Sequence, residues 1–574
     1  MRYIFLIFVL LFYGCQNSVK SETSFDNLSN AFVNWYYKNN PVEATKVNLG
    51  AYNDKFKINN FKSSEQYLLD LNRFYFELTQ INYKKMSKNK EREYRRLEKF
   101  MTRLLFQSEN VNSAQWTPLF EIMQIEQGLR YLLSYNYIPM KNKILYISLR
   151  LDSISKILDN SLTNLFFISD KDYIQSIKKI DSVIDLLNNI DKNLDYENIL
   201  QRNLISKSKD TVLRLKKYKK ELSGAKADSS QFDKSYTINN DSFGVMTELD
   251  IDINLIYKKA VNNLKTEQIK LFNNCLPIYL KYEDEPVWAF YEDTLNVIKY
   301  VINDIEEKNK VIDLTYVEES YKKNIFSKFN LLKFNYYEDF GDFSFITEEM
   351  DVVVPVNLKG KLQVNLPKVS SQQTKYNKIN IDLLNAHNIY PGYLYFFYST
   401  NEPFTDSNNN GIWDEGEKYL DINSNNEWNR LGPVIKNFPN ISMVAGYMRY
   451  AERLFVKTSK LAIKEHKIMH QRNLVKDILK CILDIDYHVN TLEATDMEKF
   501  LKENTFLHDI EILNLINKLE SNYFGYLSRK YIGYNKLMEL ERDYFNTNQE
   551  KNYLEFYDSI VKYGIVDKYK FSSV

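Results

Sequence analysis

Apolar residues recur at intervals of three and four along most of this 574-residue chain. The stretch from Tyr67 to Leu78 keeps this interval, and residues 97–105 and 173–187 repeat it. Such spacing gathers apolar side chains on one face of an α-helix. The chain has only 15 glycines and 11 prolines, too few for the many turns of a sandwich, barrel or propeller. We therefore predict a predominantly α protein, built as a large multi-helix bundle.

One segment divides the helical pattern into two regions. Residues 28–222 form helix after helix without a repeat of fixed period, which argues against a solenoid. Residues 223–243 lose the periodicity and gain serine, aspartate and asparagine. We therefore predict an N-terminal helical region over 28–235 and a C-terminal helical region over 236–574.

The C-terminal region is predicted to depart from helix at two places. Helical spacing is clear over 247–273, 286–308 and 441–489. Near 350–367, β-branched residues bounded by proline and glycine predict a small β-hairpin. Residues 401–432 form an insertion rich in aspartate and asparagine.

The N-terminus has the pattern of a secretion signal. A basic start at Arg2 precedes ten apolar residues, 4–13, which are too few to span a bilayer. Gly14 followed by Cys15 resembles a bacterial lipobox, so residues 1–14 are predicted to be a lipoprotein signal peptide and Cys15 to be lipidated. An ordinary secretory signal with an incidental Cys15 is the alternative.

The predicted lipid ties the mature chain to a membrane. Residues 15–27 are mostly polar and are predicted to form a tether. Gln16, rather than an aspartate, follows the cysteine, so retention at the inner membrane is not signalled. We therefore expect a bacterial cell-envelope location, at the outer membrane or on the periplasmic face.

The charges of the chain are balanced, with 76 Lys and Arg against 75 Asp and Glu. This balance provides no broad positive surface, so nucleic acid is not an expected partner. Besides Cys15 the chain has Cys275 and Cys481, whose spacing fits neither a disulfide framework nor a ligand cluster. One disulfide and two buried free thiols both remain open.

Residues 406–417, DSNNNGIWDEGE, match the calcium loop D-x-[DN]-x-[DN]-G-x5-E at every specified position. A hard cation needs six to eight oxygens around one point. The expected ligands are Asp406, Asn408, Asn410, the carbonyl of Ile412, Asp414 and both carboxylate oxygens of Glu417. We therefore predict a calcium site here, structural rather than catalytic; an ion-free loop held by Asx turns is the alternative.

A second, weaker copy of the loop begins 15 residues later, at 421–432. Its sequence DINSNNEWNRLG keeps Asp421, Asn423 and Asn425, but Gly432 stands where the bidentate glutamate is needed. This copy is predicted to bind weakly or to lend a ligand to the first. The tandem resembles the calcium-binding Asp/Asn repeats of secreted bacterial proteins.

Three further stretches occur in the order found in one protein family. They are PVEATKVNLGAYNDKF (41–56), NAHNIYPGYLY (385–395) and VAGYMRYAERL (444–454). Together they resemble the bacterial domain-of-unknown-function 885 family, whose signatures are H-E-x-x-P-G-H-H and E-G-W-A-x-Y-x-E. The resemblance implies a helical, metallopeptidase-like fold with a cleft, in proteins that are often secreted and lipidated. A later stretch, 484–501, is similar to the family's D-x-G-x-H segment.

The resemblance also implies that the metal site is degenerate. A catalytic zinc needs three protein ligands and an open position for water. His387 matches the first family histidine and Glu452 is retained, but the base position is Asn388, the next histidine falls on Tyr393, and the ligand glutamate falls on Ala445. One imidazole does not hold zinc tightly, so zinc is not expected. The predicted remnant of the cleft comprises His387, Asn388, Tyr390, Tyr393, Ala445, Tyr450 and Glu452.

The other residues near these motifs are expected to be structural. Glu452 is expected to form an ion pair with Arg449 or Arg453. His466 and His470 lie four residues apart without an obvious third ligand, and we expect them on an exposed helix face. A family tyrosine near the C-terminus falls on Lys530, in agreement with the loss at the metal site.

These observations predict a catalytically inactive cell-envelope lipoprotein that binds a peptide or another envelope component. Two alternatives remain. The first is an active hydrolase with a diverged catalytic set, for which His387, Tyr390, Tyr393 and Glu452 are the candidates. The second is an outer-membrane lipoprotein that captures nutrients together with a transporter.

Overall fold

The computed structural model of the chain describes its helices and part of the segments between them. The described residues are 2–47, 49–110, 117–134, 138–166, 168, 170–192, 198–224, 240–281, 291–310, 377–388, 391–392, 396, 400, 402, 404–405, 407, 416–419, 428, 430–490, 492–522, 524–547, 553, 556, 560 and 564. The predicted β-hairpin near 350–367 lies outside them.

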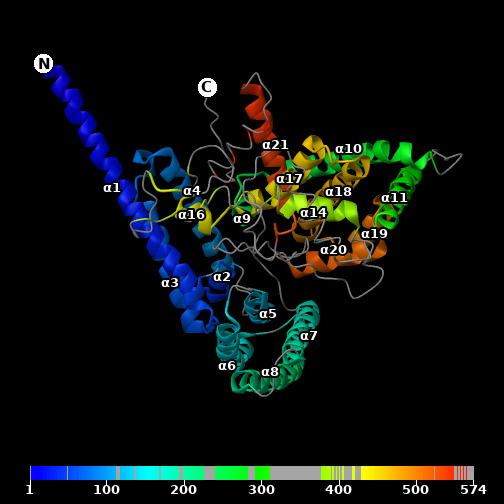
Figure 1. Cartoon of the computed structure of the whole chain (residues 1–574), viewed down its shortest axis with the longest axis horizontal. Helices are drawn as coiled ribbons and strands as arrows, with labels where there is room; N and C mark the ends of the chain where they lie inside the picture. Colours follow the sequence, from blue (N-terminus) through cyan, green and yellow to red (C-terminus); the bar gives the residue numbers. More distant parts are fainter. Residues whose placement is uncertain are drawn as a thin grey trace. The chain divides into compact units, whose positions relative to one another are not determined.

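Contacts divide the chain into two compact units, the first containing α1 to α8 and the second α9 to α21 (Figure 1). Unit 1 consists of α1 (Arg2–Asn39), α2 (Pro41–Lys46), η1 (Gly50–Tyr52), α3 (Phe61–Thr79), η2 (Tyr83–Lys85), α4 (Lys88–Asn110), α5 (Leu119–Ser134), α6 (Met140–Asn164), α7 (Asp170–Lys192) and α8 (Ile199–Gly224). Unit 2 consists of α9 (Asn240–Thr247), α10 (Ile253–Tyr279), α11 (Tyr291–Lys308), α14 (Lys378–Asn388), α16 (Pro433–Asn437), α17 (Ile441–Thr458), α18 (Lys464–His488), α19 (Ala494–Asn504), α20 (Asp509–Ser521) and α21 (Arg529–Thr547). The described residues contain no β-strand, and isolated bridges join Lys310 to Asn377 and Phe404 to Tyr419. The prediction of a predominantly α fold is confirmed.

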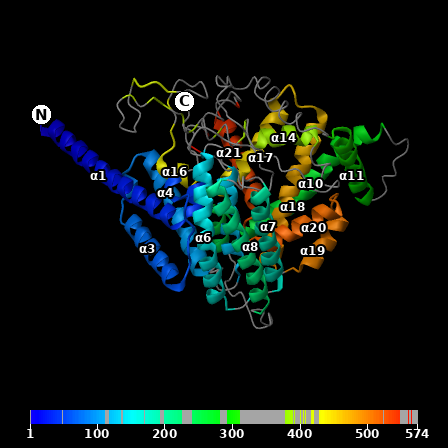
Figure 2. The same ribbon diagram turned by 60° about the horizontal axis from the view of Figure 1, so that its bottom comes forward.

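Apolar side chains of α5, α6, α7 and α8 make the core of unit 1, and α6, α7 and α8 run side by side (Figure 2). The stripe predicted over 173–187 belongs to this core, since Ile180, Ile184 and Leu187 are buried. Burial of such stripes, more than helix propensity, stabilises helices of this length.

The stretch 41–56 forms α2, η1 and the loop that follows. It covers Arg150 of α6, which is fully buried. The guanidinium donates to the Thr45 hydroxyl at 2.5 Å and to the carbonyl of Gly128 in α5, and it lies 5.0 Å from the centre of the Phe56 ring. The N–H groups of a buried guanidinium need hydrogen-bond acceptors. The stretch 41–56 provides one of them, the Thr45 hydroxyl, and therefore stabilises the packing of unit 1.

Helix α1 continues without interruption to Asn39, so it includes residues 15–27. Phe25 and Phe32 are both fully buried, so part of the predicted tether belongs to the packed body of unit 1. Among the described residues, no helix has the length and apolar character needed to cross a membrane.

In unit 2, α17 and α21 pack against each other at two glycines. A Cβ atom added to Gly446 would lie 2.1 Å from the carbonyl carbon of Gly533. A Cβ atom added to Gly533 would lie 1.8 Å from the carbonyl oxygen of Ser442. Only glycine permits this approach of two backbones, which explains both residues without reference to chemistry.

Cys275 of α10 and Cys481 of α18 are free and buried. Burial raises the pKa of both thiols above the ordinary value, so they remain protonated at neutral pH. Of the two possibilities left open by the sequence, the structure has the free thiols.

Replacing Gly533 by alanine is expected to destabilise the protein by about 3 kcal/mol, because the added methyl group forces α17 and α21 apart. The measurement is the shift of the urea unfolding midpoint, converted to a free energy. Gly224→Ala is the control, since a Cβ there meets nothing within 4 Å, and its effect should stay within about 0.5 kcal/mol. Equal effects of the two variants would contradict the close crossing.

Candidate functional site

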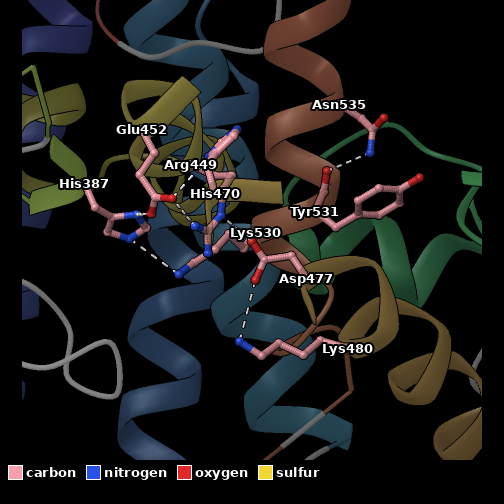
Figure 3. A network of polar contacts seen from close by, with 9 residues as sticks. All are labelled: His387, Arg449, Glu452, His470, Asp477, Lys480, Lys530, Tyr531 and Asn535. Carbon is pink, nitrogen blue, oxygen red and sulfur yellow. Dashed lines mark hydrogen bonds and ion pairs between the residues drawn. The ribbon is translucent and has the colours of Figure 1, made fainter. Parts of the chain in front are cut away.

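Two residues of the predicted site, His387 and Glu452, come together in unit 2 with side chains of α18 and α21 (Figure 3). His387 lies near the C-terminal end of α14, and Glu452 lies on α17. Asp477 and His470 belong to α18, and Lys530 lies in the first turn of α21. The side chain of Asn388, together with Tyr390 and Tyr393, lies outside the described residues.

His387 is buried and has a partner at each ring nitrogen. Its Nδ1 lies 2.6 Å from Oε1 of Glu452, and its Nε2 lies 3.4 Å from Nζ of Lys530. A lysine ammonium only donates, so Nε2 accepts and Nδ1 carries the proton that is donated to Glu452. Burial, reinforced by the Lys530 charge, lowers the pKa of His387 to about 4. The imidazole is therefore neutral at neutral pH.

Glu452 accepts hydrogen bonds from three side chains. These are Arg449, one turn earlier on the same helix, His387, and Nδ1 of His470 at 3.3 Å. Burial alone would raise the pKa of Glu452, but the Arg449 guanidinium and the two imidazoles hold it well below the ordinary value. Of the two arginines predicted as partners, Arg449 forms the pair; Arg453 pairs with Glu541 instead.

Arg449 also joins α17 to α18. Its Nε donates to Asp477 at 2.7 Å, and Lys480 lies 3.6 Å from the other oxygen of the same carboxylate. Although burial opposes ionisation, Arg449, Lys530 and Lys480 keep the pKa of Asp477 below its usual value. Leaving the imidazoles aside, two carboxylates (Glu452 and Asp477) face three cations (Arg449, Lys480 and Lys530), so these five side chains carry one net positive charge.

Nε2 of His387, the residue that matches the first family histidine, therefore faces an ammonium group. A metal ligand needs a free lone pair at this atom. Nε2 of His387 already accepts from Lys530, and a metal ion there would compete with an ammonium group for the same lone pair. Across the described parts of the chain, no three His, Cys, Asp or Glu side chains are grouped so that they could hold a metal ion. With a pKa of about 4, His387 is also a weak general base at neutral pH.

Tyr450 and Ala445 take no part in this network. Tyr450 is fully buried on α17, and its ring meets Phe556 edge to face at 6.0 Å. Its burial makes it a core residue. Burial and the nearby Glu541 carboxylate also raise its pKa well above the ordinary value. Ala445 is half-buried beside the Gly446 crossing.

The Pro391-Gly392 segment packs against the C-terminal end of α14. A Cβ on Gly392 would lie 2.3 Å from the carbonyl oxygen of His387, and the Tyr447 hydroxyl donates to the Pro391 carbonyl at 2.7 Å. Both contacts restrain the backbone around His387. The retained Pro-Gly motif therefore has a positional role.

The expectation that His466 and His470 lie on an exposed helix face is wrong. Both are buried, with 3% and 8% exposure. His466 accepts from the Ile463 N–H and donates to Asp382 at 3.1 Å, while His470 joins Glu452. Helix α18 is packed by α10, α14, α17 and α21, and side chains of these neighbours satisfy its polar groups inside unit 2.

Sequence reasoning missed three members of the network, namely His470, Asp477 and Lys480. They share one side of α18, because they are spaced by seven and three residues. That spacing alone gave no sign of burial, because α18 carries many other polar residues and the partners of these three lie partly on other helices.

Asp484 of α18 positions the start of α21, and thereby Lys530. Its carboxylate accepts from the Ser528 N–H at 2.9 Å, the Ser528 hydroxyl at 2.6 Å and the Gly525 N–H at 3.3 Å. Burial raises its pKa to about 6, against the effect of these bonds. His488 lies 3.6 Å from the same carboxylate. Asp484 and His488, which fit the D and H of the family's D-x-G-x-H segment, therefore lie close together.

The predicted calcium loop is described only at its base. Thr405 N–H donates to the Lys418 carbonyl at 2.7 Å, next to the Phe404–Tyr419 bridge. The Ser407 N–H donates to Oε1 of Glu417 at 2.7 Å. The other predicted ligands, Asp406, Asn408, Asn410, Ile412, Asp414, Asp421, Asn423 and Asn425, lie outside the described residues.

No family model matches the sequence, and no match was found among curated proteins. The fold is similar to the structure of a predicted lipoprotein of unknown function from Shewanella oneidensis, with a TM-score of 0.67, 17% identity, and coverage of 94% of this chain and 97% of that one. It is also similar to a predicted lipoprotein from Colwellia psychrerythraea, with a TM-score of 0.68, 10% identity, and coverage of 95% and 96%. At these identities the likeness shows the fold alone, and membership of the 885 family stays a prediction.

Replacing Lys530 by methionine is expected to raise the pKa of His387 by about one unit, because a like charge beside the imidazole is removed. The chain has five histidines, so the titration can be followed by NMR of the full chain labelled at histidine Cε1. Lys480→Met is the control, since Lys480 contacts Asp477 rather than the imidazole. The same shift in both variants would argue against a direct Lys530–His387 contact.

Proposed function

We propose that this chain is a lipoprotein of the bacterial cell envelope, anchored through a lipid on Cys15, that binds a ligand without catalysing a reaction. The signal-peptide pattern of residues 1–14 supports the anchor. The two structural neighbours support it as well, because each covers nearly the whole chain and each is a predicted bacterial lipoprotein.

The contact between Lys530 and His387 carries the non-catalytic part of the proposal. A zinc peptidase uses an imidazole lone pair for the metal and a carboxylate for the attacking water. Here the lone pair of Nε2 accepts from an ammonium group, and Asn388 stands at the position of the base. The remaining carboxylate, Glu452, is committed to Arg449 and two imidazoles.

The same geometry supports an anionic ligand. Leaving the imidazoles aside, the network carries one net positive charge, and Lys530 is the partly exposed member of the His387–Lys530 contact. An ammonium group at the edge of a buried ion network favours a carboxylate, since a charge-assisted hydrogen bond contributes about 1.5–3 kcal/mol. We take the ligand to be a peptide or other envelope component that presents a carboxylate at Lys530.

The insertion at 401–432 is proposed to hold a structural calcium ion. The contact of Glu417 with the Ser407 N–H, together with the paired base of the loop, supports this, because it brings the last predicted ligand back to the first turn. Calcium outside the cell suits weak sites of about 10⁻⁴–10⁻³ M.

We expect trialanine with a free C-terminus to bind the full chain more tightly than trialanine amide, as measured by isothermal titration calorimetry. Lys530→Met should weaken binding of the free acid about tenfold or more, since the charge-assisted bond is lost. Lys480→Met should weaken it much less, because Lys480 contacts Asp477 and not the proposed ligand position.

Equal binding of acid and amide would contradict the carboxylate assignment. Peptide hydrolysis by the wild-type chain that disappears in His387→Ala would contradict the non-catalytic proposal, and would favour the diverged hydrolase.

Calcium content is expected to be about one or two ions per chain after dialysis against about 1 mM calcium, measured by mass spectrometry of the metal. Glu417→Gln should lower it, because the bidentate ligand is lost. Glu498→Gln, which alters an exposed carboxylate of α19 paired with Lys502, serves as the control. Stoichiometric zinc would mean that the metal ligands are misassigned.

A further inference from the structure

Unit 1 contains two buried carboxylates on one helix with opposite surroundings. Glu126 of α5 has three partners: Arg130 at 2.9 Å, Lys179 of α7 at 3.1 Å and the Ser182 hydroxyl at 2.7 Å. Burial opposes its ionisation, but these partners hold its pKa below the ordinary value. Glu126 is therefore ionised throughout the neutral range.

Glu121, in the first turn of α5, lacks such partners. It is 4% exposed, and neither carboxylate oxygen has a hydrogen-bond partner among the described residues. Both oxygens are closed to solvent, which leaves no room for a water molecule beside them. An ionised carboxylate in this position is destabilised by the full free energy of its desolvation.

The charged groups around α5 do not remove this cost. From α6, Arg150 bonds the Gly128 carbonyl and Lys143 bonds the Leu133 carbonyl. From α2, Lys46 lies beside Glu43 of the same helix, and from α7, Lys179 pairs with Glu126. Each of these cations is bonded elsewhere, and none of them hydrogen-bonds Glu121.

Two titratable groups interact with the Glu121 charge at longer range. Lys57 precedes α3, and its ammonium lies over the Tyr67 ring, 4.2 Å from the ring centre. Tyr218 of α8 donates to or accepts from the Ser161 hydroxyl at 2.8 Å, and the Glu121 charge disfavours its ionisation. Lys57 attracts the Glu121 charge without coming within ion-pair distance of it.

We propose that Glu121 is a proton-controlled latch of unit 1: the neutral carboxyl group allows α5 to close against the loop before α3 and against α8, and ionisation loosens this end of the unit. Burial raises the pKa of Glu121 to about 7, partly opposed by its local backbone, Asn59 and Lys57. Burial likewise lowers the pKa of Lys57 to about 8. The latch therefore responds close to neutral pH.

The direction follows from linkage. The closed form has a pKa of about 7, and an opened, hydrated glutamate has one of about 4.3. Protons are therefore bound more tightly in the closed form, so its stability falls as pH rises from about 4.3 to about 7. Between pH 6 and pH 8 the opening equilibrium should rise about tenfold.

The test is hydrogen exchange of the full chain, followed by mass spectrometry at pH 6 and pH 8 and corrected for the intrinsic pH dependence of amide exchange. Peptides from α5 and from 53–60 should lose about tenfold in protection in the wild type, whereas peptides from α18 should not. In Glu121→Gln, which keeps the shape and removes the charge, protection at both pH values should match the wild type at pH 6 or exceed it.

Two further variants keep the proposal falsifiable. Glu126→Gln should lower protection at both pH values and retain the pH dependence. Lys57→Met should increase the loss of protection between pH 6 and pH 8, because the ammonium that favours ionised Glu121 in the closed form is gone. The proposal is overturned if wild type and Glu121→Gln show the same pH dependence, or if the pH dependence follows Glu126 instead.

Discussion

The approach of the α17 and α21 backbones at Gly446 and Gly533 is the constraint on which the arrangement of unit 2 depends. Neither residue carries a side chain, so the two helices lie closer than any other pair of residue types would allow. Arg449 lies three residues after Gly446, and Lys530 lies three residues before Gly533. Both cations are therefore within about one turn of the crossing, and the crossing decides which charges surround His387.

The buried charges follow one rule in both units. Removing an ion from water costs several kcal/mol, and only close partners offset that cost. Arg449 meets Glu452 of its own helix and Asp477 of α18, and Glu126 meets three donors. His387 avoids the cost by remaining neutral. When Glu121 is ionised, no hydrogen-bond partner among the described residues offsets the cost of removing its charge from water. Unit 1 therefore accommodates this side chain in its neutral, protonated form.

The sequence motifs indicated which residues come into contact. The stretch 385–395 contains His387 and the stretch 444–454 contains Glu452, and the structure brings these two side chains together. The family pattern has a tyrosine at the position of Lys530, so the sequence indicated this residue only as a departure from the motif. The error over His466 and His470 has a physical cause: polar residues along a helix resemble a solvated face unless their partners on other helices are known. Those partners, Asp382 and Glu452, lie 84 and 18 residues away.

By itself, the sequence determined the helical class of the protein, because the spacing of apolar residues and the scarcity of glycine and proline are properties of short segments. It also predicted a secretion signal and showed a calcium-type pattern, both of which are read from consecutive residues. Only the tertiary structure decided that Lys530 contacts His387, 143 residues away in the chain. It also decided that, within the described parts of the chain, the Glu121 carboxylate oxygens have no hydrogen-bond partner while Glu126 has three. Such outcomes depend on which helix faces meet, and packing of distant segments determines that, rather than the local order of residues.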